Sequence, residues 1–327
     1  MVRAIQVSVP GGPEVLETVD LPRPAAGAGQ VLVRAHAIGV GKPDFLFRTG
    51  VYRWMPKLPA VLGSEMTGHV EELGPGVEGL RIGQPVLVTN YTGGCYAEYI
   101  AAPLSAVTPL PDGIDLDDAA SLSNYQTAWA LLNQAARRDM VRSVYINGAA
   151  GGIGSAVVQI AARDGLTVIA GASSERKCAF AREQGATHTI DYGREPVVER
   201  VLALTGGRGV DLVLDHIVGK DFTDNLKMLA PLGQIVSFNV LGGLPEKDLF
   251  REMRAHLPKS PSVRCFTMHS YDHDPAMKQR IAAEAIALFA GGAVKPPIYR
   301  RLPLVEARRA HEMLDAREVL GKLILKP

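Results

Sequence analysis

The stretch that decides the fold is VYINGAAGGIG, which covers residues Val144–Gly154. Its apolar start predicts a strand, the residues from Gly152 onward predict a helix, and glycines at 148, 151, 152 and 154 occupy the turn. A turn without side chains lets backbone N–H groups approach a phosphate, and the helix N-terminus adds partial positive charge. Tight strand–helix turns also use glycine for steric reasons, so the stretch alone leaves a binding turn and a structural turn open.

Short strands and helices alternate on both sides of this turn. We expect strands at Ser143–Asn147, Leu166–Gly171, Thr187–Ile190, Val210–Asp215 and Gln234–Phe238, and helices at Gly152–Arg163, Ser174–Gln184, Pro196–Leu204 and Phe222–Leu229. This alternation is typical of an α/β fold with a doubly wound parallel sheet. Because the glycine-rich turn opens the series, a nucleotide-binding role is favoured over a structural one.

The two ends of the chain have a different pattern of apolar and turn-forming residues. Short apolar runs separated by Gly, Pro and Asn fill the first 120 residues and predict a β-rich barrel or sandwich, with strands at Ala4–Val9, Val31–Val40, His69–Leu73, Pro85–Thr89 and Tyr96–Ala101. The tail predicts a helix near Val305–Asp315 and a strand at Lys322–Leu325. We therefore expect a discontinuous β-rich domain, residues 1–121 and 262–327, with an α/β domain, residues 122–261, inserted.

Composition excludes several classes of protein. Of 327 residues, 47% are apolar and 21% charged, which suits a packed core, and the net charge of +1 gives no field for nucleic acid or an anionic membrane. Cys95, Cys178 and Cys265 are scattered, which argues against a disulfide framework. We see neither a signal peptide nor a transmembrane segment, and expect a soluble, cytoplasmic protein with no nucleic-acid or membrane partner.

The end of the second α/β strand bears on the choice of nucleotide. No Asp or Glu stands at its tip to accept ribose hydroxyls; Ser173, Ser174, Arg176 and Lys177 follow instead. Hydroxyls and a cation suit a 2′-phosphate, which a carboxylate would repel. Ser174 also suits the N-cap of the next helix, and both roles are compatible. The sequence therefore favours NADPH over NADH, although Glu175 lies only a few residues beyond the tip.

Segments in order along the whole chain resemble one family. The chain is similar to the medium-chain dehydrogenase/reductases, in their quinone oxidoreductase (zeta-crystallin-like) branch. The resemblance is carried by Gly63–Gly68, Gly94–Tyr99, Ala119–Ala130, Asn147–Gly154, Gly185-Ala186 with Ile190–Tyr192, Asp211–Asp215 and Gly321–Leu323. It implies a Rossmann doubly wound parallel sheet inserted in a GroES-like β-rich domain that serves substrate and catalysis.

The family divides by its use of zinc. Zinc-dependent members place a Cys where this chain has Gly41, a His where it has Ser64 and a Cys near Ser123, and none of these supplies the S or N ligand of a catalytic zinc. The four-cysteine structural loop is missing, and His269 and His273, four residues apart, follow a predicted strand. We expect no metal. Without a Lewis acid, acceptors that are already electrophilic are favoured, such as quinones and α,β-unsaturated carbonyls.

The resemblance also assigns the NADPH site. It implies that Thr127 contacts the nicotinamide side, that Tyr192 lies near the adenosine phosphate, and that the backbone around Phe238, Val240 and Phe266 holds the carboxamide. Elsewhere these residues are ordinary helix or packing residues, and Lys322 would be a surface charge. The full expected set is Thr127, Gly148, Ala150, Gly151, Gly152, Ile153, Ser173, Ser174, Lys177, Tyr192, Phe238, Val240, Phe266 and Lys322.

Tyr52 and Asp44 are the candidate catalytic residues. Many relatives have Asn where this chain has Gly41, and Lys42 cannot imitate an amide because it only donates. Asp44 either organises the site or caps a short helix at Phe45–Arg48. Tyr52 either donates a hydrogen bond to a carbonyl oxygen or only lines the cleft.

These observations predict an NADPH-dependent, zinc-free reductase of quinones or similar conjugated carbonyl compounds. An enoyl-thioester or enone reductase shares the fold, the cofactor and the absence of zinc, and depends on a proton donor for the carbanion. A redox sensor or structural protein that binds NADPH is the non-enzymatic alternative, since relatives have been recruited as lens crystallins. By resemblance we expect a homodimer, formed through an edge strand within Ser262–Met268.

Overall fold

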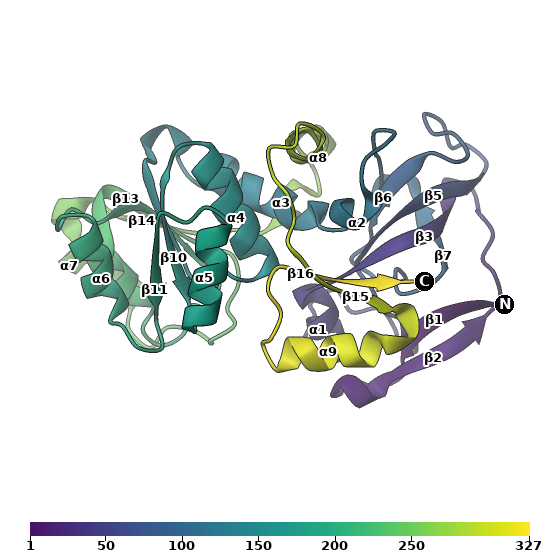
Figure 1. Ribbon diagram of the computed structural model, residues 1–327, viewed down its shortest axis with the longest axis horizontal. Coiled ribbons are helices and arrows are strands. Elements are labelled where there is room, and N and C mark those ends of the chain that lie inside the picture. The colour runs from purple at the N-terminus through teal and green to yellow at the C-terminus, as the bar shows by residue number, and fades with distance from the viewer. The chain divides into compact units, whose positions relative to one another are not determined.

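The alternating segments after residue 142 form one parallel sheet of six strands in the order β11-β10-β9-β12-β13-β14 (Figure 1). The computed structural model describes all 327 residues, and its contacts divide the chain into unit 1, residues 1–123 and 286–327, and unit 2, residues 124–285. The strands of unit 2 are β9 (Ser143–Ile146), β10 (Thr167–Ala172), β11 (His188–Asp191), β12 (Val210–Asp215), β13 (Leu229–Ser237) and β14 (Ser262–Cys265). This strand order is the doubly wound arrangement that the sequence predicts.

Helices cover both faces of this sheet. Helices α4 and α5 lie on one face, and α6 and α7 lie on the other (Figure 1). The helices are α3 (Leu122–Ala130), α4 (Gly152–Arg163), α5 (Glu175–Glu183), α6 (Val197–Leu204), α7 (Leu249–Ala255) and α8 (Pro275–Ala290), with a 3₁₀ helix η5 (Phe222–Met228). The core between them is aliphatic and aromatic, with Tyr145, Ile169, Val213 and Ile235 buried at its centre.

The boundary of this unit differs from the one expected at residue 262. Strand β14 pairs in parallel with β13, with Ile235 beside Val263 and Ser237 beside Cys265, so it belongs to the six-stranded sheet. The compact unit extends to Ala285 and includes most of α8. This helix lies beyond the alternating strands and helices from which the sequence analysis set the domain boundary.

Unit 1 is β-rich. A seven-stranded sheet has the order β15-β16-β3-β5-β6-β8, with β7 also paired to β3, and a three-stranded sheet has the order β2-β1-β4. The strands are β1 (Val2–Val7), β2 (Leu16–Leu21), β3 (Gln30–Val40), β4 (Ala60–Val61), β5 (Glu65–Leu73), β6 (Pro85–Thr89), β7 (Tyr99–Pro103), β8 (Val107–Pro109), β15 (Ile298–Pro303) and β16 (Lys322–Lys326). The helices are α1 (Lys42–Arg48), α2 (Leu116–Ala119) and α9 (Ala307–Asp315).

Among the elements that differ from their sequence predictions, two do so for clear reasons. The segment predicted as a helix at Phe222–Leu229 is a 3₁₀ helix that stops at Met228, because Leu229 pairs with Val210 and starts β13. Strand β2 was not predicted, because it lies at a sheet edge and alternates charged with apolar residues. No helix combines the length and apolar character that crossing a membrane requires.

Candidate active site

The glycine-rich turn joins β9 to α4, and the fold itself requires two of its glycines. Gly148 has φ of +61°, and a side chain there would overlap the ring of His216. A side chain at Gly154 would overlap the Gly148 carbonyl, whereas one at Gly152 would meet the end of the flexible Asn124 side chain. A structural reason for glycine is therefore present at Gly148 and Gly154. It does not by itself argue against a ligand.

Gly151 is different, and it stands where a phosphate would approach. Its Cβ would meet only the Gly148 carbonyl oxygen, 3.5 Å away, so neither space nor φ of −80° requires glycine. Gly151 is also the N-cap of the twelve-residue helix α4, and no side chain caps this helix. An uncapped helix N-terminus with a glycine cradle in front of it fits an anionic phosphate.

The residues after β10 form a small polar cluster with a cation. Ser174 caps α5, because its hydroxyl accepts a hydrogen bond from the Lys177 backbone N–H at 3.4 Å. The Lys177 ammonium donates to the Ser173 hydroxyl at 3.1 Å. The expected cap is therefore present, and the ammonium lies beside a serine hydroxyl; the role of this cluster in binding a 2′-phosphate stays a prediction.

Glu175 does not compete with this cluster as a free carboxylate. It forms an ion pair with Arg182 on the same helix, and Arg182 also donates to the Thr189 hydroxyl at 2.6 Å. The paired carboxylate is therefore tied along α5. The Lys177 ammonium, by contrast, lies at the Ser173 hydroxyl.

Several other predicted cofactor residues lie at the carboxyl ends of the same parallel strands. Tyr192 follows β11, Phe238 and Val240 follow β13, and Phe266 follows β14. Thr127 lies on α3 of the same unit, whereas Lys322 lies in unit 1 at the start of β16. The carboxyl edge of a doubly wound sheet is where ligands bind, so unit 2 brings most of the set to the appropriate edge.

His216 is a residue at this edge that sequence reasoning missed. Its ring occupies the space that glycine leaves at position 148 and lies 5.6 Å, centroid to centroid, from the ring of Phe238. Its position directly after a buried strand, next to the strand of the glycine-rich turn, is the signal that could have identified it.

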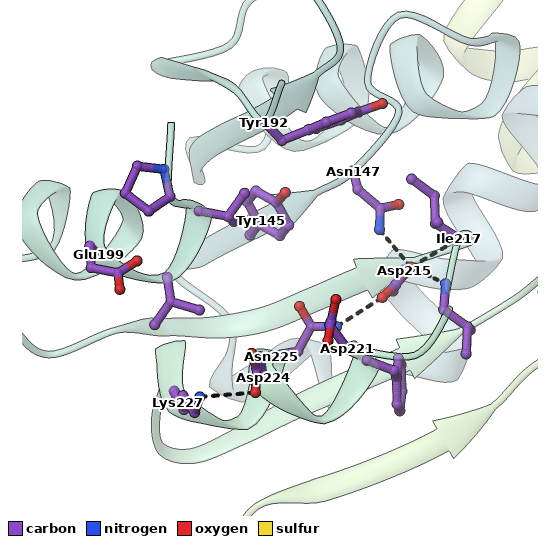
Figure 2. A pocket seen from close by; sticks show the side chains of 15 residues that line it. Tyr145, Asn147, Tyr192, Glu199, Asp215, Ile217, Asp221, Asp224, Asn225 and Lys227 are labelled. Carbon is purple, nitrogen blue, oxygen red and sulfur yellow. Dashed lines mark hydrogen bonds and ion pairs between the residues drawn. The ribbon is translucent and has the colours of Figure 1, made fainter. Parts of the chain in front are cut away.

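A cavity of about 400 Å³ lies beside Tyr192, lined by residues that follow β9, β11 and β12 (Figure 2). Asp215 lies in one wall of this cavity. Its carboxylate accepts hydrogen bonds from the side-chain amides of Asn147 at 2.5 Å and Asn225 at 2.8 Å. It also accepts the backbone N–H groups of Ile217 at 2.8 Å and Val218 at 2.9 Å. Because β9 and β12 flank the reversal of strand order, Asn147 and Asp215 clamp the sheet at its switch point.

Unit 1 places Asp44 at the centre of a second cluster. One carboxylate oxygen accepts the Gly41 backbone N–H at 2.8 Å and so caps α1, and the other accepts the Ser64 backbone N–H at 2.9 Å. The expected helix cap is therefore present, and Asp44 also ties α1 to the residue before β5; its role as organiser of a catalytic site stays a prediction. Burial raises the pKa of Asp44 to about 6, outweighing these hydrogen bonds and the nearby Lys322.

Tyr96 and His311 form a buried pair in the same unit. The Tyr96 hydroxyl lies 3.2 Å from Nε2 of His311, and burial raises the pKa of Tyr96 well above its ordinary value. Burial and the Arg48 guanidinium lower the pKa of His311 to about 3, so this imidazole is neutral near pH 7. The pair stays uncharged at neutral pH.

The three positions tested for zinc lie around charged groups that already neutralise one another. Ser123 donates its hydroxyl to Glu65, and Glu65 forms an ion pair with Lys322. Ser64 contributes its backbone to Asp44, and Gly41 has no side chain. An ammonium beside the only acidic groups repels a divalent cation, so these residues do not fit a catalytic zinc.

Tyr52 lies near Asp44 and Tyr91 in unit 1. Burial is the main cause that raises its pKa above the ordinary value, and both neighbours add to the effect. The phenol therefore stays protonated throughout the neutral range. It can donate a hydrogen bond, but it does not titrate there.

Comparison with known proteins places these features in one family. The model for an alcohol dehydrogenase GroES-like domain matches residues 27–112, and the model for a zinc-binding dehydrogenase matches residues 152–285. A quinone oxidoreductase of Pseudomonas aeruginosa is 36% identical over the full length of both chains.

Solved structures agree with the family models. Escherichia coli quinone oxidoreductase, in complex with NADPH, has a TM-score of 0.91 at 28% identity and covers 99% of this chain and 100% of its own. A 2-haloacrylate reductase has a TM-score of 0.86 at 28% identity and covers 100% of this chain and 99% of its own. The chain belongs to the quinone oxidoreductase branch of the medium-chain dehydrogenase/reductases and is an oxidoreductase.

Proposed function

We propose that this oxidoreductase binds NADPH on unit 2 and transfers hydride, without zinc, to quinones or similar conjugated carbonyl compounds. The observation that carries the cofactor proposal is the uncapped N-terminus of α4 behind Gly151. Backbone N–H groups and the helix dipole there suit the pyrophosphate. NADPH, when bound, supplies the hydride and its two electrons.

The preference for NADPH over NADH is supported by the cluster after β10. Lys177 and the hydroxyls of Ser173 and Ser174 offer one cation and two polar groups to a 2′-phosphate. Glu175, the acid at the start of α5, is paired with Arg182. The Escherichia coli relative, whose solved structure contains NADPH, supports the same assignment.

The cavity beside Tyr192 suits the adenosine end of the cofactor. It lies at the carboxyl edge of the sheet, between the strand ends that carry Tyr192 and Asp215. An aromatic ring and amide groups can bind a planar heterocycle by stacking and hydrogen bonds. We propose that the adenosine part of NADPH extends toward this cavity.

Zinc independence is part of the proposal, although the family model that covers unit 2 is named for zinc binding. It is supported by the chemistry at positions 41, 64 and 123, where the side chains supply no thiolate or imidazole and a lysine lies among them. The acceptor must then be electrophilic on its own, which favours quinones and enones over simple ketones.

An enone or enoyl-thioester reductase is the second candidate. The relative named 2-haloacrylate reductase favours it, because its name describes reduction of an activated carbon–carbon double bond. A panel of one quinone, one enone and one enoyl thioester, each assayed with NADPH and NADH, separates the two. Oxidation of NADPH only by the thioester or enone would make the second candidate correct. Tight NADPH binding with no turnover on any acceptor would support a sensor role instead.

We also propose that the enzyme is a homodimer formed through β14. This strand is at the edge of the six-stranded sheet, and Leu244, Phe250 and Leu257, just before it in sequence, are exposed. Sedimentation should give twice the chain mass of 35.0 kDa, and Val263→Pro should shift the protein to monomer. A monomeric wild type at micromolar concentration contradicts the dimer. The cytoplasmic location stays a prediction.

A further inference from the structure

Arg48 is a buried cation at the end of α1 with hydrogen-bond donors left over. Its Nη2 atom donates to both carboxylate oxygens of Asp315 on α9, at 3.0 and 2.9 Å. Its Nε and Nη1 atoms are buried as well, and neither has a hydrogen-bond partner. An unpaired donor of a charged group is costly away from water, and buried polar groups are almost always satisfied by protein, water or a ligand. The guanidinium therefore points to an oxygen atom that the polypeptide does not supply.

His311 presents a second unpartnered atom beside this guanidinium. His311 and Asp315 are four residues apart on α9, so they lie on the same face of that helix. The guanidinium that binds Asp315 is therefore close to the imidazole, and its charge is one of the causes that lower the pKa of His311. The Nδ1 atom of His311 is buried and has no hydrogen-bond partner.

The Tyr96 hydroxyl decides which nitrogen of His311 carries the proton. This hydroxyl has a single proton, and its oxygen lies 3.2 Å from Nε2 of His311. Its other partner is Asp44, and this hydrogen bond is one of the causes that raise the pKa of Tyr96. An ionised carboxylate only accepts, so Tyr96 donates to Asp44 and accepts from the imidazole. His311 then carries its proton on Nε2, and Nδ1 is an acceptor.

An acceptor at Nδ1 selects the kind of molecule that fits beside Arg48. A small anion accepts from a guanidinium, but it has no proton to donate to the Nδ1 lone pair. Water accepts from one N–H of Arg48 and donates to Nδ1 of His311, and buried water commonly joins such groups. The neutral state of the imidazole, whose pKa is about 3, agrees with this arrangement.

We propose that an enclosed water molecule joins Arg48 to His311, and that His311 and Tyr96 are positioning residues for the Asp44 carboxylate. The hydrogen bonds of this network run in one direction, from the guanidinium through water, imidazole and phenol to the carboxylate. The network itself is independent of the proposed function, whereas the consequence for turnover rests on it, because Asp44 is a candidate catalytic residue.

The Asp44 carboxylate also has neighbours outside this network. Lys322 on β16 lowers its pKa, and Glu65 on β5 raises it. A donor to a carboxylate favours the ionised form, so the Tyr96 hydroxyl acts in the same direction as Lys322. The uncharged groups around Asp44 are the backbone N–H groups of Gly41 and Ser64, the phenol of Tyr52 and the thiol of Cys95.

The tautomer of His311 is the first test. In protein with isotopically labelled histidine, heteronuclear NMR should show His311 neutral and protonated on Nε2 from about pH 5 to about pH 8. His311→Gln identifies the signal by removing it. A ring protonated on Nδ1 would place an anion beside Arg48 and overturn the proposal. A crystal grown in bromide should likewise show no anomalous signal at this place.

Tyr96→Phe tests whether the network acts on Asp44. Loss of the donated hydrogen bond should raise the pKa of Asp44 from about 6 to about 7. NMR of labelled aspartate carboxyl groups measures this, with Asp44→Asn to assign the signal. Tyr125→Phe is the control, because it removes a phenol in unit 2 that donates to Gln159 at 2.7 Å. An unchanged pKa of Asp44 in folded Tyr96→Phe would overturn the proposal.

A pair of His311 variants covers a failure of Tyr96→Phe to fold. The amide of His311→Gln still donates to Tyr96, so the titration of Asp44 should stay near that of the wild type. His311→Leu removes this donor and should raise the pKa of Asp44, because the phenol then donates more weakly. Equal titration of Asp44 in the two variants would remove His311 from the network.

Turnover separates this inference from the proposed function. The acid limb of the pH profile of kcat/KM, measured with NADPH and a quinone, should move up by about 1 in Tyr96→Phe, together with the titration of Asp44. A profile that stays in place while Asp44 shifts would show that the network does not serve the reaction. A wild type inactive with every acceptor would defeat the proposed function, and the tautomer and the Asp44 titration would still decide the network.

Discussion

Arg182 holds the carboxylate of Glu175 in an ion pair along helix α5, seven residues away in sequence. This contact pairs a carboxylate that, if free, would repel a 2′-phosphate next to Ser173, Ser174 and Lys177. If NADPH binds there as proposed, its affinity should depend on Arg182.

Arg182→Ala should free Glu175 and weaken the preference for NADPH. A carboxylate released near a phosphate repels it, so the Kd for NADPH should rise several-fold while that for NADH changes little. Fluorescence titration with both nucleotides measures this. Glu175→Gln/Arg182→Ala is the matched control and should restore NADPH binding. Equal losses for both nucleotides would show that Arg182 acts through the fold instead.

Gly151→Ala and Gly148→Ala should separate binding from folding. The methyl group at 151 has space, so this variant should keep its melting temperature and lose NADPH affinity at the phosphate cradle. Gly148 has positive φ and no room, so its variant should lose about 1–3 kcal/mol of stability. Thermal unfolding and NADPH titration of both variants test this. Normal NADPH binding by folded Gly151→Ala would remove the cradle from the site.

Tyr52→Phe should distinguish hydrogen bonding from packing at the substrate side. Because burial keeps the phenol protonated, wild-type activity should show no titration of Tyr52 in the neutral range. The variant should lose little rate with quinones and, if an enoyl thioester is the true substrate, on the order of 100-fold with that substrate. Rate profiles for both acceptor classes, from about pH 6 to about pH 9, provide the measurement. A quinone rate that falls as steeply as the thioester rate would contradict this.

Asp44 should make stability depend on pH in a specific direction. Its pKa in the folded protein, about 6, is above the ordinary 3.8, so the folded state holds this proton more tightly than the unfolded state. The contribution of Asp44 to the free energy of unfolding is present below the ordinary pKa and is lost as pH rises toward 6.

Asp44→Asn lacks this titration. As pH rises from acid to neutral, the free energy of unfolding of this variant should therefore increase relative to that of the wild type. Urea unfolding of both proteins at matched pH values measures the difference. Curves that stay parallel across this interval would show that Asp44 is ionised throughout.

Much of the fold could be predicted from local patterns. Helix Gly152–Arg163 and strand Val210–Asp215 have the predicted bounds, because glycine or turn residues flank them and their apolar spacing is clear. Strand β14 was expected to lie in the β-rich domain, and helix α8 was not predicted. Their membership of unit 2 is set by pairing with β13 and by packing, which local sequence does not encode.

The site was predictable only where a motif has a fixed mechanism. The glycine-rich turn and the serines after β10 could be identified from the sequence. Glu65 lies in the segment Gly63–Gly68, which carries the family resemblance, but the sequence assigned it no role. Its partners Ser123 and Lys322 are 58 and 257 residues away, and only the folded sheet brings them together. The Tyr96–His311 pair was missed for the same reason, whereas His216 follows a predicted buried strand and could have been identified from its position.

The central claim is that this enzyme oxidises NADPH with a conjugated carbonyl acceptor and needs no zinc. The most direct test is a steady-state assay of chelator-treated protein of measured metal content, with 1,4-benzoquinone and either NADPH or NADH. The account predicts full activity at negligible zinc content and a kcat/KM for NADPH well above that for NADH. Activity that disappears with the chelator and returns with stoichiometric zinc, or a preference for NADH, would contradict it.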